Sequence, residues 1–222
     1  MSFKTIPLVG ALLLLFSVNA SAQYPVRMLE IGIGSNSYKG DLNSSFDKWA
    51  PSFHTGLRFN WEKRINLSVE GMFGKIQAQS TTYISPDPDK NPLRFVESSF
   101  WGVHAEGNLN FVQTKRWKVY LYQGVGFMRF TLKDEEGNKL LEFENISDSR
   151  ADGESLDDRT IYLPTGLGAI YFLKNGFGIS GKIGLLNPLT DYLDNMSELG
   201  DPDNNDMVLQ GRISLLVPLR FD

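Results

Sequence analysis

Apolar and polar residues alternate along most of this chain, and the pattern is clearest in its last segment, residues 207–221. Every odd position from residue 213 onward is apolar: Ile213, Leu215, Val217, Leu219 and Phe221. Such a period of two is typical of a β-strand with one face in apolar surroundings. An unpaired apolar strand at a chain end would template aggregation unless another strand covered its edge. The pattern therefore predicts a terminal strand that pairs with the first strand of a closed barrel.

Seven other segments alternate in the same way, so eight strands are expected. They span residues 27–38, 52–61, 66–79, 95–112, 117–130, 160–173, 177–187 and 207–221. The connections between them are long and short in strict alternation, and both ends of the strand-forming region fall on the short-turn side. An even number of strands with short turns on one side and long loops on the other is typical of a transmembrane barrel. We expect an all-β fold, an eight-stranded antiparallel transmembrane β-barrel with OmpA-like architecture.

A soluble lipocalin-like barrel would show the same period with its apolar face inside, so the orientation of the faces needs a separate argument. Trp61, Trp117, Phe177 and Phe221 stand at strand ends beside the short turns, where an aromatic girdle at a membrane interface is expected. The opposite face carries charges of both signs. These features favour lipid on the outside and leave the soluble lipocalin-like binder as an alternative.

The interior of an eight-stranded barrel is only wide enough to be filled by side chains. The polar face is expected to form an interior network from these residues: Arg58, Glu70, His104, Glu106, Lys182 and Arg212. Because unpaired buried charge is costly, these side chains must pair with one another. Glycines on the same face, such as Gly184, are expected to make room for them.

The N-terminus predicts export. Lys4 precedes an apolar run over residues 6–18, and Ala20-Ser21-Ala22 follows as a small-x-small cleavage site. We interpret residues 1–22 as a cleaved signal peptide and residues 23–222 as a single outer-membrane barrel domain. The chain has no Cys, so neither a lipid anchor at the cleavage site nor a disulfide framework is expected. The formal net charge of −4 gives no reason to expect nucleic acid as a partner; outer-membrane lipid is the expected surrounding.

Four segments carry a family resemblance: EIGIGSNSYKGDLN at 30–43, FVQTKRWKVYLYQGVGFMRF at 111–130, TDYLDNMS at 190–197 and NDM at 205–207. Together they resemble the PorG-like outer-membrane β-barrel family of Bacteroidetes, which belongs to the type IX secretion system. The chain departs from that pattern in ending Arg220-Phe221-Asp222 and in carrying fewer aromatic residues in its sixth strand.

The resemblance implies an integral, multi-pass barrel of the cell outer membrane that anchors or docks a protein secretion machine. Its implied partners are periplasmic ring subunits that resemble PorK and PorN. It implies no catalytic residues. No metal and no cofactor are expected. Its most specific piece is the family-motif loop, formed by Thr190, Asp191, Tyr192, Leu193 and Asp194.

Other functions remain as alternatives. Some eight-stranded barrels modify lipid with a His and a Ser or carboxylate, but His54 and His104 are the only histidines and no matching set is evident. The acidic residues of 201–206 lack the spacing of a calcium loop, so a solvated turn is expected there. The acidic segment Glu135–Asp158 is either a surface loop or a docking surface. A barrel with an unrelated structural or surface role is the main alternative to the secretion component.

Overall fold

The computed structural model describes residues 27–80, 93–140, 149–150, 156–196 and 206–219. The expected signal peptide, Phe221 and the acidic residues of 201–205 lie outside these ranges. Among the described residues, no helix is both long and apolar enough to cross a membrane.

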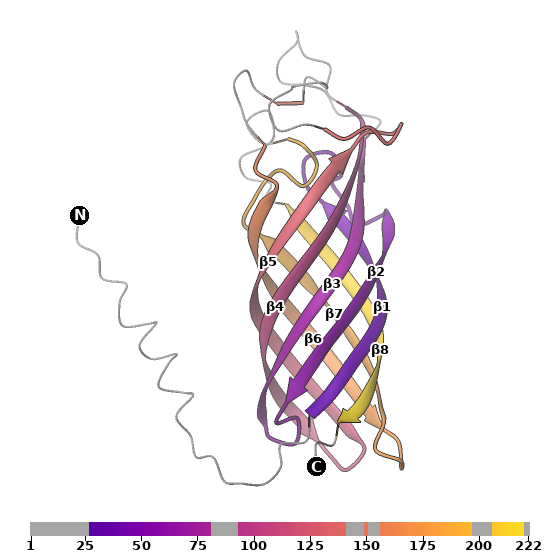
Figure 1. Cartoon of the computed structure of the whole chain (residues 1–222), viewed down its shortest axis with the longest axis vertical. Coiled ribbons are helices and arrows are strands. Elements are labelled where there is room, and N and C mark those ends of the chain that lie inside the picture. The colour runs from indigo at the N-terminus through magenta and orange to yellow at the C-terminus, as the bar shows by residue number, and fades with distance from the viewer. Residues whose placement is uncertain (1–26, 81–92, 141–148, 151–155, 197–205, 220–222) are drawn as a thin grey trace, which may run out of the picture.

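Eight strands close into one antiparallel barrel, in which each strand pairs with its sequence neighbours and the last pairs with the first (Figure 1). The strands are β1 (Arg27–Lys39), β2 (Trp49–Phe59), β3 (Ile65–Gln79), β4 (Phe95–Gln113), β5 (Trp117–Lys133), β6 (Arg159–Phe172), β7 (Gly178–Pro188) and β8 (Met207–Leu219). Pairing of β1 with β8 runs over thirteen residue pairs, from Arg27 opposite Leu219 to Lys39 opposite Met207. The predicted closure of the terminal strand is confirmed.

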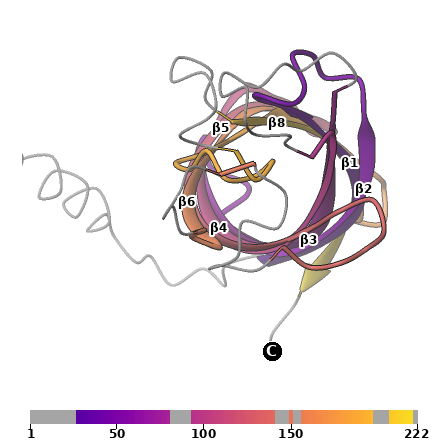
Figure 2. The same ribbon diagram turned by 90° about the horizontal axis from the view of Figure 1, so that it is seen from above.

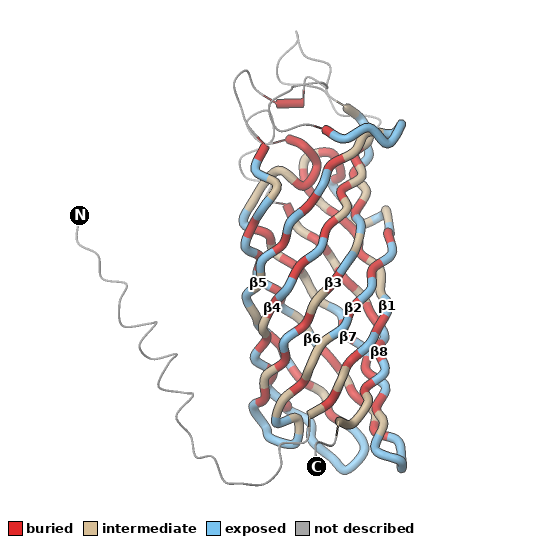
Figure 3. The backbone as a smooth tube through the Cα atoms, in the orientation of Figure 1, coloured by how far each residue is buried: buried red, intermediate tan, exposed pale blue. Residues whose placement is uncertain are grey.

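Burial alternates along most of each strand, and in Figure 3 the buried positions, in red, are separated by tan or pale blue positions that are intermediate or exposed. The exposed positions are largely apolar: Ile33, Ile65 and Ile213 expose 71%, 72% and 66% of their surface. Half of the charged residues of the strands are buried: Glu30, Arg58, Glu70, Glu106, Lys118, Lys182 and Arg212. A barrel in water would bury its apolar residues and expose its charged ones. The outer face of this barrel is therefore suited to contact with lipid.

All short turns lie at one end of the barrel, together with the start of β1 and the end of β8 (lower end of Figure 1). The strand ends that the longer connections join lie at the opposite end. In a transmembrane barrel the short turns face the periplasm. We therefore call the end with the short turns the inner end and the opposite end the outer end.

Two strand limits differ from the sequence prediction by three residues, each for an identifiable reason. β2 begins at Trp49, ahead of the predicted Ser52, because Pro51 faces outward at the outer end and stays in register opposite Ser35. β5 continues to Lys133, beyond the predicted Phe130, in register with β4 as far as Glu97.

The predicted girdle position of Trp61 is wrong. β2 ends at Phe59, and Asn60 adopts a positive φ of 52°, which breaks the alternation that would have turned Trp61 outward. The indole instead packs on Phe172 inside the inner end, with ring centroids 4.6 Å apart. Trp117 does face outward, as expected for the girdle.

The interior is filled in three layers. An outer apolar layer includes Tyr38, Phe100, Phe130, Leu193 and Met196, and it extends from the strands into the outer loops. An inner apolar layer contains Met28, Tyr120, Tyr122, Ile170, Phe172 and Leu216, against which Trp61 packs. Between them lies a layer of charged side chains, which is the candidate site.

Candidate functional site

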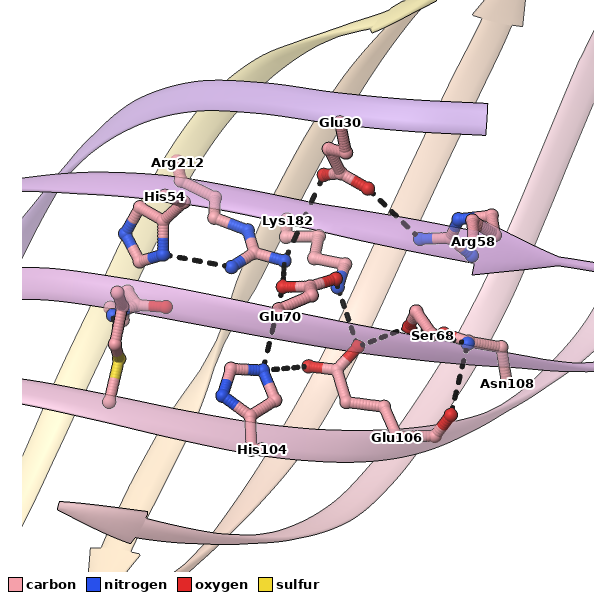
Figure 4. Close-up of polar contacts among 12 residues, drawn as sticks. Glu30, His54, Arg58, Ser68, Glu70, His104, Glu106, Asn108, Lys182 and Arg212 are labelled. Atoms are coloured by element: carbon pink, nitrogen blue, oxygen red, sulfur yellow. Dashed lines mark hydrogen bonds and ion pairs between the residues drawn. The ribbon is translucent and has the colours of Figure 1, made fainter. Parts of the chain in front are cut away.

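All six residues predicted for the interior network are buried in the middle layer (Figure 4). They project inward because each occupies an inward position of the strand alternation, on β2, β3, β4, β7 and β8. Glycine makes part of the space. A β-carbon at Gly126 would lie 2.5 Å from His104 Cβ and 2.6 Å from the Tyr162 ring, so only glycine fits there.

Side chains from three other strands contact the Glu70 carboxylate. Lys182 Nζ lies 2.6 Å from its Oε1, and the Arg212 guanidinium donates to its Oε2. His104 Nε2 lies 3.5 Å from the same Oε2. The Glu70 carboxylate therefore joins β3 to β4, β7 and β8 across the barrel.

Glu106 is the second acidic centre. Lys182 Nζ donates to its Oε2 at 2.6 Å, and Ser68 Oγ donates to the same oxygen at 3.2 Å. His104 Nε2 lies 3.1 Å from its Oε1. The ammonium of Lys182 thus bridges two carboxylates that would otherwise repel each other.

Arg58 forms the inner edge of the network. Its guanidinium lies 3.4 Å from Glu30 and donates to the Tyr120 hydroxyl at 2.9 Å, and it also stacks over the Tyr120 ring. Glu30 also lies 3.8 Å from Arg212. Glu30 is not among the six residues predicted for the interior network, and its contacts add it to the site.

Within the described residues the network is balanced in charge. Three carboxylates, Glu30, Glu70 and Glu106, face three permanent cations, Arg58, Lys182 and Arg212. Glu70, His104 and Glu106 also offer ligand atoms close enough together to hold a metal ion. Lys182 Nζ already lies 2.6 Å from both carboxylates, so an ammonium fills the place a cation would take.

A Ser–His pair is present but faces the wrong way for nucleophilic catalysis. His54 Nε2 lies 3.0 Å from Ser52 Oγ, and Arg212 donates to His54 Nδ1 at 3.0 Å. Because Nδ1 accepts from a guanidinium, the ring proton is on Nε2 and points at the serine. His54 therefore cannot take a proton from Ser52, and both side chains are buried.

The family-motif loop lies across the outer mouth of the barrel, where it appears in orange-yellow in Figure 2. Leu193 and Asp194 are buried, Asp191 and Tyr192 are half-buried, and Thr190 Oγ1 accepts from the Tyr192 amide at 3.4 Å. We call residues 190–196 the outer cap.

Two carboxylates fasten the outer cap to its neighbours. Asp194 accepts from the Leu42 amide at 3.0 Å and from the Met196 amide at 3.0 Å. Asp206 accepts from the Leu193 amide at 2.9 Å and from the Tyr38 hydroxyl. The cap is thereby tied to the end of β1, to the loop after it and to the residue before β8.

Burial raises the pKa values of the acidic groups in and beside the outer cap. Burial raises the pKa of Asp194 to about 7, against the amide hydrogen bond from Leu42, which lowers it. Burial and the neighbouring Asp194 raise the pKa of Asp206 well above its usual range. Burial and the nearby Asp41 raise the pKa of Asp191 as well. The cap is held in place most firmly when these carboxyls carry protons.

The comparisons with known proteins agree with this geometry. Residues 8–209 match the family model for the outer membrane protein beta-barrel domain. The search of curated proteins finds no significant match. Ail, the attachment invasion locus protein of Yersinia pestis, is 12% identical in its crystal structure with the heparin analogue sucrose octasulfate, with a TM-score of 0.51 over 89% of this chain and 100% of Ail.

Neisserial surface protein A is 10% identical, with a TM-score of 0.54 over 87% of this chain and 97% of its own. At these identities the two structures show a shared fold. The family match spans most of the sequence and covers β1 to β7 in full and β8 as far as its third residue. The chain therefore belongs to the outer membrane protein beta-barrel domain family and resides in the outer membrane as an eight-stranded barrel.

Proposed function

We propose that this barrel is a non-enzymatic anchor or docking component of the outer membrane, and that it serves a protein secretion machine of the type IX kind. The anchor or docking role is supported by one observation, that the interior of the barrel is filled. An apolar layer, a charge-balanced polar layer and a second apolar layer succeed one another along the axis. The function of such a filled barrel then depends on its surfaces.

An enzymatic role is disfavoured by the orientation of the polar groups. The acidic groups of the network are engaged by Arg58, Lys182, Arg212 or His104, and Ser52 faces the protonated nitrogen of His54. A lipid-modifying barrel needs a nucleophile and base that lipid can reach. These groups are buried on the inward face.

The secretion role rests on the family resemblance, and most specifically on the motif loop. Its residues build the outer cap, and the buried side chains of Asp194, Asp206 and Leu193 fix the loop over the mouth. A fixed loop gives a docking partner a preformed surface, which lowers the entropic cost of association. Because the cap lies at the outer end, it presents this surface on the side away from the periplasm. The periplasmic ring subunits resembling PorK and PorN are the proposed partners of the inner end, where the short turns lie.

A surface role like that of an adhesin is the second candidate. The crystal structure of Ail contains a heparin analogue, a highly anionic ligand. Here the outer segments are acidic, with Asp134, Glu135, Glu136, Asp157 and Asp158 among their described residues. Charge repulsion disfavours a sulfated ligand on this barrel.

The test is co-purification from native outer membranes, with an affinity tag inserted between Glu135 and Asp158. We expect ring subunits to be recovered in a fixed ratio and deletion of the gene to stop secretion. A second tagged chain, with the outer cap replaced by a Gly-Ser linker, separates partners that need the cap from those that bind elsewhere. Recovery of the barrel alone, with secretion intact after deletion, would reject the secretion role and favour an unrelated surface role.

A further inference from the structure

The short turns of the inner end share an unusual composition. They connect β2 to β3, β4 to β5 and β6 to β7 (lower end of Figure 1). Together they carry five exposed cations, Lys63, Arg64, Lys115, Arg116 and Lys174, against a single acid, Glu62. None of the five forms an ion pair with a described residue. We call this set the inner basic rim.

The rim is held in shape by its turns. The Lys63 amide donates to the Asn60 carbonyl at 2.8 Å, and the Gly176 amide donates to the Leu173 carbonyl at 3.1 Å. In the middle turn the Trp117 amide donates to Thr114 Oγ1 at 2.9 Å, and the Thr114 amide donates to the Trp117 carbonyl at 2.8 Å. The cations therefore project from rigid positions.

In each of the three turns, one cation lies beside a side chain that faces lipid. Arg64 precedes Ile65, which is 72% exposed, and Arg116 precedes Trp117, which is 51% exposed. Lys174 follows Leu173, which is 39% exposed. Cations that directly flank an apolar band lie at the depth of the lipid headgroups, where long basic side chains reach the phosphates.

We propose that the inner basic rim binds the phosphates of anionic phospholipids in the inner leaflet, which fixes the depth of the barrel in the membrane. Basic residues next to a bilayer attract anionic headgroups, and the attraction adds up over several Lys and Arg side chains. An acidic protein surface has the same charge, but Arg64, Arg116 and Lys174 directly adjoin lipid-facing side chains, which places them level with the headgroups. The proposal stands independently of the secretion role.

The experiment uses the mature chain refolded in phosphatidylcholine vesicles that contain phosphatidylglycerol. Trp117 is kept as the only fluorophore by replacing Trp49, Trp61 and Trp101 with Phe. Brominated phosphatidylglycerol and brominated phosphatidylcholine are then compared as quenchers at equal mole fraction. We expect quenching by the anionic lipid to be stronger by about twofold or more, and high salt to remove the difference.

Replacing all five rim cations with Gln is expected to make the two brominated lipids quench Trp117 equally. The matched control replaces three exposed outer-end cations instead, Lys75→Gln, Arg129→Gln and Arg159→Gln, and is expected to keep the preference at Trp117. A charge-conserving variant, R64K/R116K, is also expected to keep it, which separates loss of charge from misfolding.

Equal quenching by the two lipids in the parent chain would overturn the proposal. So would a preference that survives neutralisation of the rim. If the neutralised barrel keeps its lipid preference but loses a protein that co-purifies with the parent, the rim is a docking surface for an acidic protein and the lipid assignment is rejected.

Discussion

Lys182 is the residue on which the polar layer depends. Its ammonium lies 2.6 Å from one oxygen of Glu70 and 2.6 Å from one oxygen of Glu106, inside a barrel where water cannot compensate either carboxylate. A buried ion pair adds little over an apolar replacement of both partners, but removing one partner leaves a charge without compensation. The network therefore specifies the packing of the interior more than it adds to the stability.

Replacing Lys182 with Met should destabilise the barrel strongly. The change keeps the length of the side chain but removes the charge between Glu70 and Glu106, and we expect a loss of about 3–5 kcal/mol in the free energy of unfolding. Urea unfolding in lipid vesicles, followed by tryptophan fluorescence, measures it.

The matched control is Lys75→Met. Lys75 pairs with Glu97 at 2.8 Å on the exposed outer surface, where an ion pair contributes roughly 0–1 kcal/mol. Similar losses in the two variants would show that the polar layer has no special role in the interior.

Alternation in the sequence was enough to place the network on the inward face, since a period of two separates the faces of a strand. It did not show which charges meet. Lys182 on β7 contacts Glu70 on β3, across the barrel, and this pairing depends on the register of all the strands between them. Glu30 was left out of the predicted site for the same reason: its partner Arg58 is identified only by the register of β1 with β2.

At the scale of elements, the strands were predictable and their ends were less so. The limits of β3 and β4 were predicted to within one residue, because a long apolar-polar alternation defines both strands. Trp61 was misplaced because the alternation does not reveal the left-handed Asn60 that ends it. The outer cap had no periodic signal at all, and only the family motif marked it. Its role follows from contacts between segments far apart in sequence, such as Asp194 with Leu42.

The outer cap should loosen as the pH rises. Burial raises the pKa of Asp194 to about 7, so the docked cap binds this proton more tightly than an open cap does. The stabilisation is complete below the ordinary carboxyl pKa of about 4 and is lost as the pH rises through about 7. Hydrogen exchange should show protection of the Leu42 and Leu193 amides falling by at least about tenfold between those limits, after correction for intrinsic exchange.

Asp194→Asn provides the control, because an amide at this position does not titrate. It should lower protection at acidic pH, since it loses one acceptor oxygen for the Leu42 and Met196 amides, and it should flatten the pH dependence. Asp157→Asn, at an exposed position, should change neither. Protection that is constant with pH in the parent chain would contradict a titrating cap.

The whole molecule is polarised along its axis. Its outer end carries the cap and acidic segments, its middle carries balanced charge, and its inner end carries an apolar plug surrounded by the basic rim. The apolar outer wall spans the lipid between the two ends (Figure 3). This arrangement suits a protein that holds a fixed position in the membrane and presents different surfaces to each side.

The same arrangement predicts that the barrel conducts no ions. An eight-stranded barrel leaves only enough interior for side chains, and here three successive layers fill it. Purified protein in a planar bilayer should show no steady current, whereas a larger porin in the same assay should. Replacing the outer cap with a Gly-Ser linker should leave the bilayer silent, because the polar layer and the plug around Trp61 and Phe172 remain. A current that appears only in this variant would make the cap a gate rather than a docking surface. A stable current from the parent chain would mean that the polar layer is open to ions, and transport would then replace docking as the function.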